Sequence, residues 1–196
     1  MTQAHLKVAS FEEACAILGV PVPEIPRGYS GRGFYQHRDE GGDLLGLGVF
    51  ANLITDIGDQ YYGERAAGIG SPPAQVTGMK LGTGSTAVAK TGAGAAIGTY
   101  AGAGVTASKA IDGTWPQSSQ PGGAGTARQI QWRTSWSAGQ ATVNGLNEVV
   151  ISNQTSLADD AGTAANTISR ALLSPVVNKG ASDTLTITWN HNLLGA

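Results

Sequence analysis

The sequence has few charged residues. Only 13% of its 196 residues are charged, about half of the usual share, and the formal net charge is −2. Such a chain has no overall field that would attract nucleic acid or an anionic membrane surface, so we expect neither as a partner. Few charges also leave a free monomer poorly protected against association. The composition fits a protein that works within an assembly, and an ordinary neutral domain is the alternative.

Cysteine is almost absent. The single cysteine, Cys15, cannot form an internal disulfide, a Cys-x-x-Cys pair or a Cys/His zinc site. Phe11, Ala14 and Leu18 share one helical face with it. We therefore interpret Cys15 as a small buried apolar residue and not as a nucleophile.

Long apolar runs are also missing. No stretch approaches the roughly 18 consecutive apolar residues that indicate a membrane-spanning helix. The opening residues, MTQAHLKVASFEEACAILG, lack the basic start and apolar core of a secretory signal, because Glu12 and Glu13 interrupt the apolar residues. We therefore expect a protein that is made and kept in the cytoplasm of its host cell unless another component carries it out.

Catalytic motifs are incomplete. The stretch GTGSTAVAKTG is similar to a phosphate-binding loop, but Ala89 instead of a glycine precedes Lys90. The three histidines, His5, His37 and His191, have no nucleophile motif such as GxSxG beside them. We therefore expect no enzymatic activity and no cofactor.

Acidic residues give no metal-site pattern. Asn153, Asp159 and Asp160 are the nearest approach to a calcium site, but their spacing matches no known calcium loop, so we predict no metal. Glu148 precedes the apolar run VVIS inside a predicted strand. A carboxylate in that position usually makes structural hydrogen bonds, which is the role we expect for it.

The N-terminal part predicts a helix followed by extended chain. In SFEEACAILG, Ser10 and Glu13 have capping-box spacing and Gly19 provides the stop. Three prolines then hold the chain extended, and glycines alternate with the aromatic and arginine residues typical of interfaces. We predict that residues 1–44 form a helix and an extended docking arm; a solvated loop is the alternative. The predicted anchors of the arm are Arg27, Tyr29, Arg32, Phe34 and Tyr35.

Residues 45–70 predict an amphipathic helix. Apolar residues recur there at helical spacing over about three turns. Asp56, Asp59 and Gln60 fall on the opposite side. We expect this helix to pack on a sheet or on a partner.

Residues 71–196 predict an all-β domain. Short alternating runs separated by glycine-bearing turns favour an antiparallel β-sandwich or jelly roll, so the fold class is mainly β. The clearest runs are QIQWRTSWS, NEVVISN, TISRALLS and TLTITWN. Trp132, Trp136 and Trp189 are the expected core anchors, and their indole N–H groups need partners.

One tryptophan lies in a turn-rich stretch. Trp115 belongs to IDGTWPQSSQPGGAG, which has the composition of an exposed loop. Sugars stack on exposed tryptophan, so Trp115 is a candidate glycan contact. The alternative, which we favour, is that the ring folds back or fills a pocket of a neighbouring molecule.

Three segments together resemble a known group of proteins. MKLGTGSTAVAKTGAGAA, NEVVISN and the terminal SRALLSPVVNKGASDTLTITWNHNLLGA resemble motifs of tailed-bacteriophage virion structural proteins, over about residues 78–196. The resemblance implies a β-sandwich module of the particle surface. It carries no catalytic site over to this chain.

The resemblance and the composition together lead to one functional expectation. We expect a non-enzymatic virion protein, made in the bacterial cytoplasm, that is anchored by its N-terminal arm as a capsid decoration or head-associated protein. A tail or baseplate accessory protein and a carbohydrate-binding surface module are the alternatives. The expected partners are the major capsid protein or tail proteins, with further copies of the chain in a homo-oligomer.

Overall fold

The computed structural model describes residues 6–22, 31–119 and 128–193. These ranges contain two α-helices, α1 (Phe11–Leu18) and α2 (Asp56–Ala67), and nine β-strands. The strands are β1 (Gly31–Arg38), β2 (Leu44–Ile54), β3 (Gly78–Gly82), β4 (Ser108–Ala110), β5 (Gln117–Ser119), β6 (Arg128–Trp136), β7 (Leu146–Ser152), β8 (Thr167–Val177) and β9 (Thr184–Leu193).

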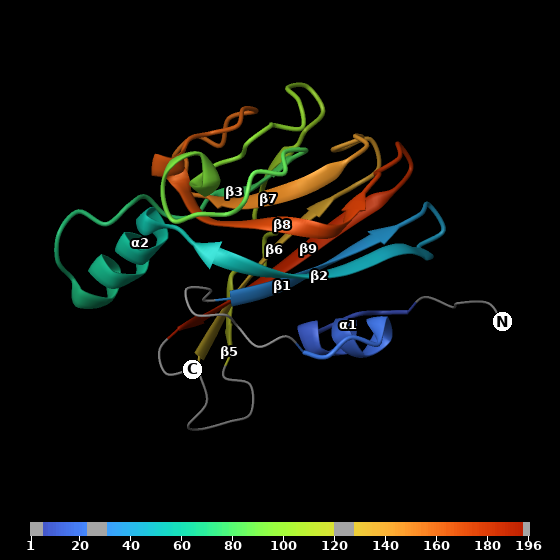
Figure 1. The fold of residues 1–196 in the computed structure, drawn as a ribbon, viewed down its shortest axis with the longest axis horizontal. Coiled ribbons are helices and arrows are strands. Elements are labelled where there is room, and N and C mark those ends of the chain that lie inside the picture. The colour runs from blue at the N-terminus through green and yellow to red at the C-terminus, as the bar shows by residue number, and fades with distance from the viewer. Residues whose placement is uncertain (1–5, 23–30, 120–127, 194–196) are drawn as a thin grey trace.

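All nine strands belong to one antiparallel sheet that curls into a half-barrel (Figure 1). Their order is β4-β3-β7-β8-β2-β1-β9-β6-β5. The mainly antiparallel β class is therefore confirmed, but the strands form one curled sheet in place of two stacked sheets. Strand β2 makes the connection, because it pairs with β1 along its length and with β8 at Leu53 and Ile54.

Hydrogen bonds hold the curl by bringing the two ends of the strand order together. Asp112 follows β4, and its backbone N–H donates to the carbonyl of Arg133 on β6 at 2.9 Å. The Asp112 carboxylate accepts from the backbone N–H of Ser135 at 3.0 Å and from its hydroxyl at 2.8 Å. One acidic residue thus links the chain after β4 to the strand next to the opposite edge.

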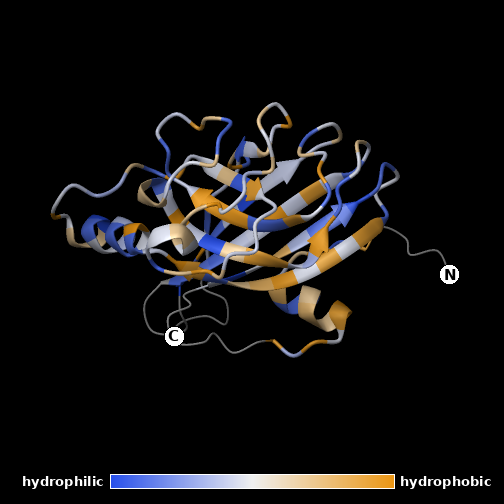
Figure 2. Cartoon of the chain, turned by 45° about the horizontal axis from the view of Figure 1, so that its top comes forward, coloured by the Kyte–Doolittle hydropathy of each residue, from blue (hydrophilic) through white to orange (hydrophobic). Residues whose placement is uncertain are grey.

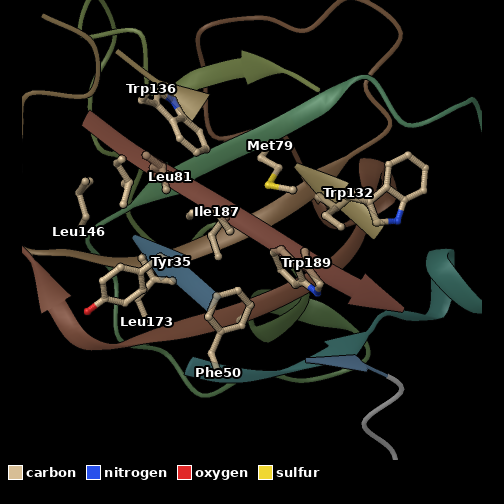
Figure 3. Close-up of a cluster of buried hydrophobic side chains, with 14 of the residues drawn as sticks. Tyr35, Phe50, Met79, Leu81, Trp132, Trp136, Leu146, Leu173, Ile187 and Trp189 are labelled. Carbon is tan, nitrogen blue, oxygen red and sulfur yellow. The ribbon is translucent and has the colours of Figure 1, made fainter. Parts of the chain in front are cut away.

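The main core fills the concave side of the sheet (Figure 3). Trp132, Trp136 and Trp189 are buried there, as predicted. The indole N–H groups of Trp136 and Trp189 have no hydrogen-bond partner within the described residues, which differs from our expectation. Glycines on β1 and β2 make room for large rings: a Cβ on Gly33 would lie 2.4 Å from the Phe50 ring, and one on Gly48 would lie 2.3 Å from the Tyr35 ring.

Helix α1 packs on the outer face of β1 and β2, and its limits follow the predicted signals. The Ser10 side chain accepts from the N–H of Glu13, and Gly19 adopts the left-handed conformation with φ of 65°. A second apolar cluster joins Phe11, Ala14 and Cys15 to Phe34 and Leu47 of the sheet. Cys15 is buried as predicted, and burial raises the pKa of its thiol.

The expected helix over residues 45–70 is wrong in its first half. Leu44–Ile54 forms strand β2, and only Asp56–Ala67 is helical, capped by Thr55. Strand β2 is covered by the core on one face and by α1 on the other, so it lacks the polar face that reveals a strand. Gly46 and Gly48 also weaken a helix at these positions.

The expected arm over residues 1–44 also needs correction. Gly31–Arg38 forms β1, which pairs with β2 on one side and with β9 on the other. This segment is therefore central to the sheet. The alternation of glycines with anchor residues predicted an extended docking arm, but two of these glycines, Gly31 and Gly33, serve close packing against β2 and β9.

Candidate functional site

The predicted arm anchors lie in different surroundings. Arg27 and Tyr29 are outside the described residues. Phe34 and Tyr35 are buried, Phe34 under α1 and Tyr35 in the main core. The Arg32 guanidinium lies 4.6 Å from the centre of the Phe11 ring and pairs with Glu12. The last three anchors therefore stabilise their own chain, and Phe34 and Tyr35 leave no exposed surface for a neighbouring molecule.

An exposed apolar surface lies instead at the end of α1 and just beyond it. Ile17, Leu18, Val20 and Val22 expose 39%, 38%, 41% and 45% of their surface. Figure 2 shows hydrophobic colour on α1 and on the short segment that follows it, on the outside of the sheet. We call these four residues the N-terminal apolar strip. Contiguous exposed apolar side chains commonly mark sites of interaction with other proteins.

A pocket opens at the end of the half-barrel where β1 and β2 meet their connecting turn. Its volume is about 260 Å³, and Tyr35, His37 and Gly46 form its inner wall. Leu45 and Val176 stand at its rim, exposing 54% and 48% of their surface. The remaining lining residues are Pro175, Val177 and Asn178. We call this the open-end pocket.

An acid–base pair fixes the polar side of the open-end pocket. The Nε2 of His37 lies 2.7 Å from Oδ2 of Asp183, which also accepts from the Gly180 N–H at 2.7 Å. Burial would raise the pKa of Asp183, but the Gly180 N–H, His37 and Lys179 outweigh it and lower that pKa. An ionised carboxylate only accepts, so Nε2 carries a hydrogen and donates it to Oδ2. A Cβ on Gly46 would lie 3.8 Å from Nδ1, which places this atom beside the pocket wall.

Two further polar groups meet the open-end pocket. The Tyr35 hydroxyl donates to the carbonyl of Pro175 at 2.7 Å, and burial raises the pKa of Tyr35 to about 12. The Asn178 Oδ1 accepts from the Gly145 N–H at 2.9 Å, which leaves its amide nitrogen without a described partner. The pocket therefore combines apolar walls with two polar atoms, Asn178 Nδ2, which is a donor, and His37 Nδ1, which accepts when the ring is neutral.

Sequence reasoning missed this pocket. His37 falls within the predicted arm of residues 1–44, and Asp183 lies 146 residues away in the sequence. The signal was present in the alternation of GRGFYQHR, which puts Tyr35 and His37 on one face of a strand.

A polar groove of about 600 Å³ crosses the outer face of β1, β9 and β6. Arg133 lies in its wall, and the Arg133 guanidinium is stacked 4.9 Å from the centre of the Trp115 ring. The Nε of Arg133 donates to Asp112 at 2.8 Å, while no described residue accepts from its two Nη atoms. Trp115 is thus half-buried against Arg133, which agrees with the fold-back interpretation on this side of the ring. The other lining residues are Lys7, Val8, Ala9, Gln36, Arg38, Gly42, Ser135 and Thr186.

The motif residues of the middle segment act as internal braces. Glu148 is fully buried on β7 and pairs with Arg170 of β8 at 2.6 Å. Its carboxylate also accepts from the N–H groups of Gly84, Gly98 and Thr99 at 2.8–3.0 Å. The glycine-rich segment between β3 and β4 is thereby fixed to the sheet, which is the structural role expected for Glu148.

The acidic residues considered for calcium hold a lysine. The buried Nζ of Lys80 donates to Oδ1 and the carbonyl of Asp160, to the Ala158 carbonyl and to Gln154 at 2.6–2.9 Å. The hydrogen bond from Lys80 is the main cause of a lowered pKa at Asp160. The Asp159 carboxylate accepts from Tyr100 and Gly104. Asp160 thus pairs with a buried ammonium group, and Asp159 holds the chain at Tyr100 and Gly104.

The described residues contain neither a metal-binding cluster nor a membrane-spanning helix. Within residues 6–22, 31–119 and 128–193, no group of three or more His, Cys, Asp or Glu side chains is arranged to bind a metal ion. In the same ranges no helix is both long enough and apolar enough to span a membrane.

Comparison with protein-family models finds no match, and comparisons with curated proteins and with solved structures find no significant match either. The likeness to phage virion proteins therefore depends on the three sequence segments alone.

Proposed function

We propose that this protein is a non-enzymatic structural component of a tailed-bacteriophage particle, made in the bacterial cytoplasm and incorporated into the virion. Capsid decoration is the role we favour, and a tail or baseplate accessory role is the alternative. The observation that best supports this proposal is the N-terminal apolar strip. Helix α1 is fixed to its own sheet by Phe11 and Cys15, and it presents exposed apolar side chains at its other edge. Such an arrangement supports docking on another virion protein.

The motif segments support the proposal in a second way. Glu148 uses its charge inside the molecule to hold the glycine-rich segment between β3 and β4, and Lys80 in the same way holds the loop between β7 and β8. The NKGASD turn does the same, because Lys179 donates to the carbonyls of Ser137 and Asp183 at 3.1 and 2.7 Å. Braced loops with few free charges suit a protein that presents a fixed surface within a particle.

Fractionation of particles tests this function and its location. Cells infected with the phage that encodes the chain should yield particles that contain it in a fixed copy ratio. A decoration protein should bind preformed capsids, whereas a tail component should remain with tails after the capsids are removed. Its absence from purified particles would reject the proposal.

A paired set of variants tests the docking surface. Val20→Glu with Val22→Glu should abolish incorporation, because two carboxylates would have to be buried at the contact. Ile69→Glu is the matched control, because Ile69 is also exposed, at 65%, and lies outside the N-terminal apolar strip. Undiminished incorporation of the double variant would remove the strip from the proposal.

A carbohydrate-binding surface is the second candidate, favoured by the polar groove. The Arg133 guanidinium is held between Trp115 and Asp112 and directs free donors at a groove large enough for an oligosaccharide. Glycan binding on an array should be lost in Trp115→Ala and in Arg133→Gln. Arg65→Gln is the control, because Arg65 stacks on Tyr61 at 4.7 Å elsewhere in the molecule. A signal that survives both groove variants would end this candidate.

A further inference from the structure

We propose that the open-end pocket of one molecule receives the Val20–Val22 segment of a second copy, so that copies join head to tail. The inference rests on the proposed docking function and names the partner as another copy of this chain. Two complementary surfaces of the same molecule, the N-terminal apolar strip and the open-end pocket, support the inference. None of the residues that line the pocket belongs to the N-terminal apolar strip.

The donor segment has no regular secondary structure, its prolines favour an extended backbone, and it presents little but apolar side chains and one peptide N–H. Pro21 separates Val20 from Val22, and Pro23 is next in the sequence, so neither proline has an N–H. The N–H of Val20 already donates to the carbonyl of Cys15 at 3.0 Å, which fixes the start of the segment to α1. The Val22 N–H has no described acceptor. Proline-containing extended segments lose little conformational entropy when they bind.

The open-end pocket has the features that such a segment requires. Leu45 and Val176 offer exposed apolar surface at its rim, and Pro175 and Val177 continue this surface inward. Nδ1 of a neutral His37 ring can accept from the single Val22 N–H. The Asn178 amide can donate to a carbonyl of the incoming segment. The open-end pocket can thus bind an apolar side chain and one peptide group of the incoming segment at the same time.

The distribution of exposed apolar side chains points to a second copy as the occupant. Among described residues, eight large apolar side chains are exposed. Four form the strip, two form the pocket rim, and Leu6 and Ile69 are the others. Contact of Val20 and Val22 with the rim would therefore cover four of the eight. The net charge of −2 opposes such an approach only weakly. Because donor and acceptor are different surfaces, the contact is heterologous and produces a ring or an open chain.

Sedimentation velocity over a wide range of protein concentration tests the inference. Wild-type protein should form species larger than a dimer as its concentration rises. The donor variant, Val20→Glu with Val22→Glu, and the acceptor variant, Val176→Glu, should each remain monomeric. All three changed side chains are exposed, so folding should survive, as circular dichroism would verify. Ile69→Glu should associate like the wild type.

Mixing the two variants is the decisive measurement. The donor variant keeps its pocket and the acceptor variant keeps its strip, so one contact per pair is restored and assembly should stop at a dimer. Gly46→Val provides a second acceptor variant that fills the pocket from its wall, since a Cβ there would lie 3.6 Å from His37 Cβ. Monomeric wild-type protein, unaltered association of the variants, or a mixture that grows beyond dimers would each overturn the inference.

Particle incorporation separates this inference from the proposed function. A wild-type protein that stays monomeric but loses incorporation on Val20→Glu with Val22→Glu would overturn self-docking and leave the virion function standing. Self-association without presence in particles would reject the virion function and leave the head-to-tail contact established.

Discussion

His37 and His191 point toward the interior from two paired strands, and their surroundings are opposite. His37 lies on β1 at the open end, with Nε2 on the Asp183 carboxylate and Nδ1 beside a pocket. His191 lies on β9, opposite Gly31, near the end where α2 packs. There the Tyr62 hydroxyl is 2.6 Å from its Nδ1, and its Nε2 has no described partner.

The comparison shows that an interior histidine can contact a ligand only where its end of the half-barrel is left uncovered by other side chains. At the α2 end, rings of Trp189 and Tyr62 lie edge-on to His191 at 6.1 and 5.7 Å, and burial lowers the pKa of His191 to about 3. The ring is therefore neutral and structural. At the open end the Asp183 carboxylate accepts from Nε2 of His37 and the ring lines a pocket, so this histidine can meet a ligand.

The largest effect expected from this contrast is a pH-dependent loss of stability caused by His191. Its folded pKa of about 3 lies below the unfolded value of about 6.5, so the unfolded chain binds more protons between these values. The contribution of His191 to the free energy of unfolding is fully present above pH ~6.5. It should fall by about 1.4 kcal/mol per pH unit as the pH decreases through this window. Urea denaturation at a series of pH values measures the slope.

A double variant isolates the contribution of His191 from that of the acidic residues. His191→Phe with Tyr62→Phe removes both hydrogen-bonding partners, which avoids leaving a buried hydroxyl unsatisfied. The difference in unfolding free energy between wild type and variant should change with pH by that slope. A constant difference between pH ~6.5 and ~4.5 would show that His191 is not neutralised by burial.

The second effect concerns the carboxylate at the open end. Asp183→Asn keeps one oxygen that can accept from both His37 and Gly180, but the acceptor becomes neutral. Hydrogen bonds to charged groups are worth about 1 kcal/mol more than neutral ones, so we expect a loss of about 1–2 kcal/mol near neutral pH.

The pH dependence of this second loss has a definite sign. The folded pKa of Asp183 is lowered, so its stabilisation is present above the unfolded value of about 3.9 and is lost as the pH falls through the folded value. The difference in unfolding free energy between wild type and Asp183→Asn should therefore disappear in acid. Thermal unfolding of both proteins at several pH values checks it, and a gap that widens in acid would contradict the assignment.

Local signals in the sequence predicted several elements correctly. The cap residues Ser10 and Gly19 delimit α1 as expected. Strands β6 and β9 follow from alternation, because each has one apolar and one polar side, as with Trp189 and Thr188. Signals of this kind depend on near neighbours in the chain, so the sequence alone reveals them.

Elements that are covered on both faces could not be predicted in this way. Strand β2 is apolar on both sides, because α1 packs on Leu47 and the core packs on Phe50. Its period of two is then hidden, and helical spacing fits the same residues equally well. The glycines of β1 looked like an arm because the rings that fill their space come from other strands.

The open-end pocket was beyond sequence reasoning for a related reason. His37, Gly46, Asn178 and Asp183 come together only through the pairing of β1 with β2 and β9 and the approach of β8. No short motif links them. The terminal segment that resembles virion proteins contains Asn178 and Asp183, but it gives no indication that they face a histidine from β1.

The smallest effect expected at the open end follows from Tyr35→Phe. The change removes the hydrogen bond to the Pro175 carbonyl and keeps the ring in the core. Because Pro175 is exposed, water can replace the lost donor, and we expect a cost of about 0.5–1 kcal/mol, the low end for a neutral hydrogen bond. Equilibrium denaturation measures this cost, with the slope of the transition as a check on folding. A loss several times larger would mean that the hydroxyl holds β8 in place, so that the open end would owe its shape to one side chain.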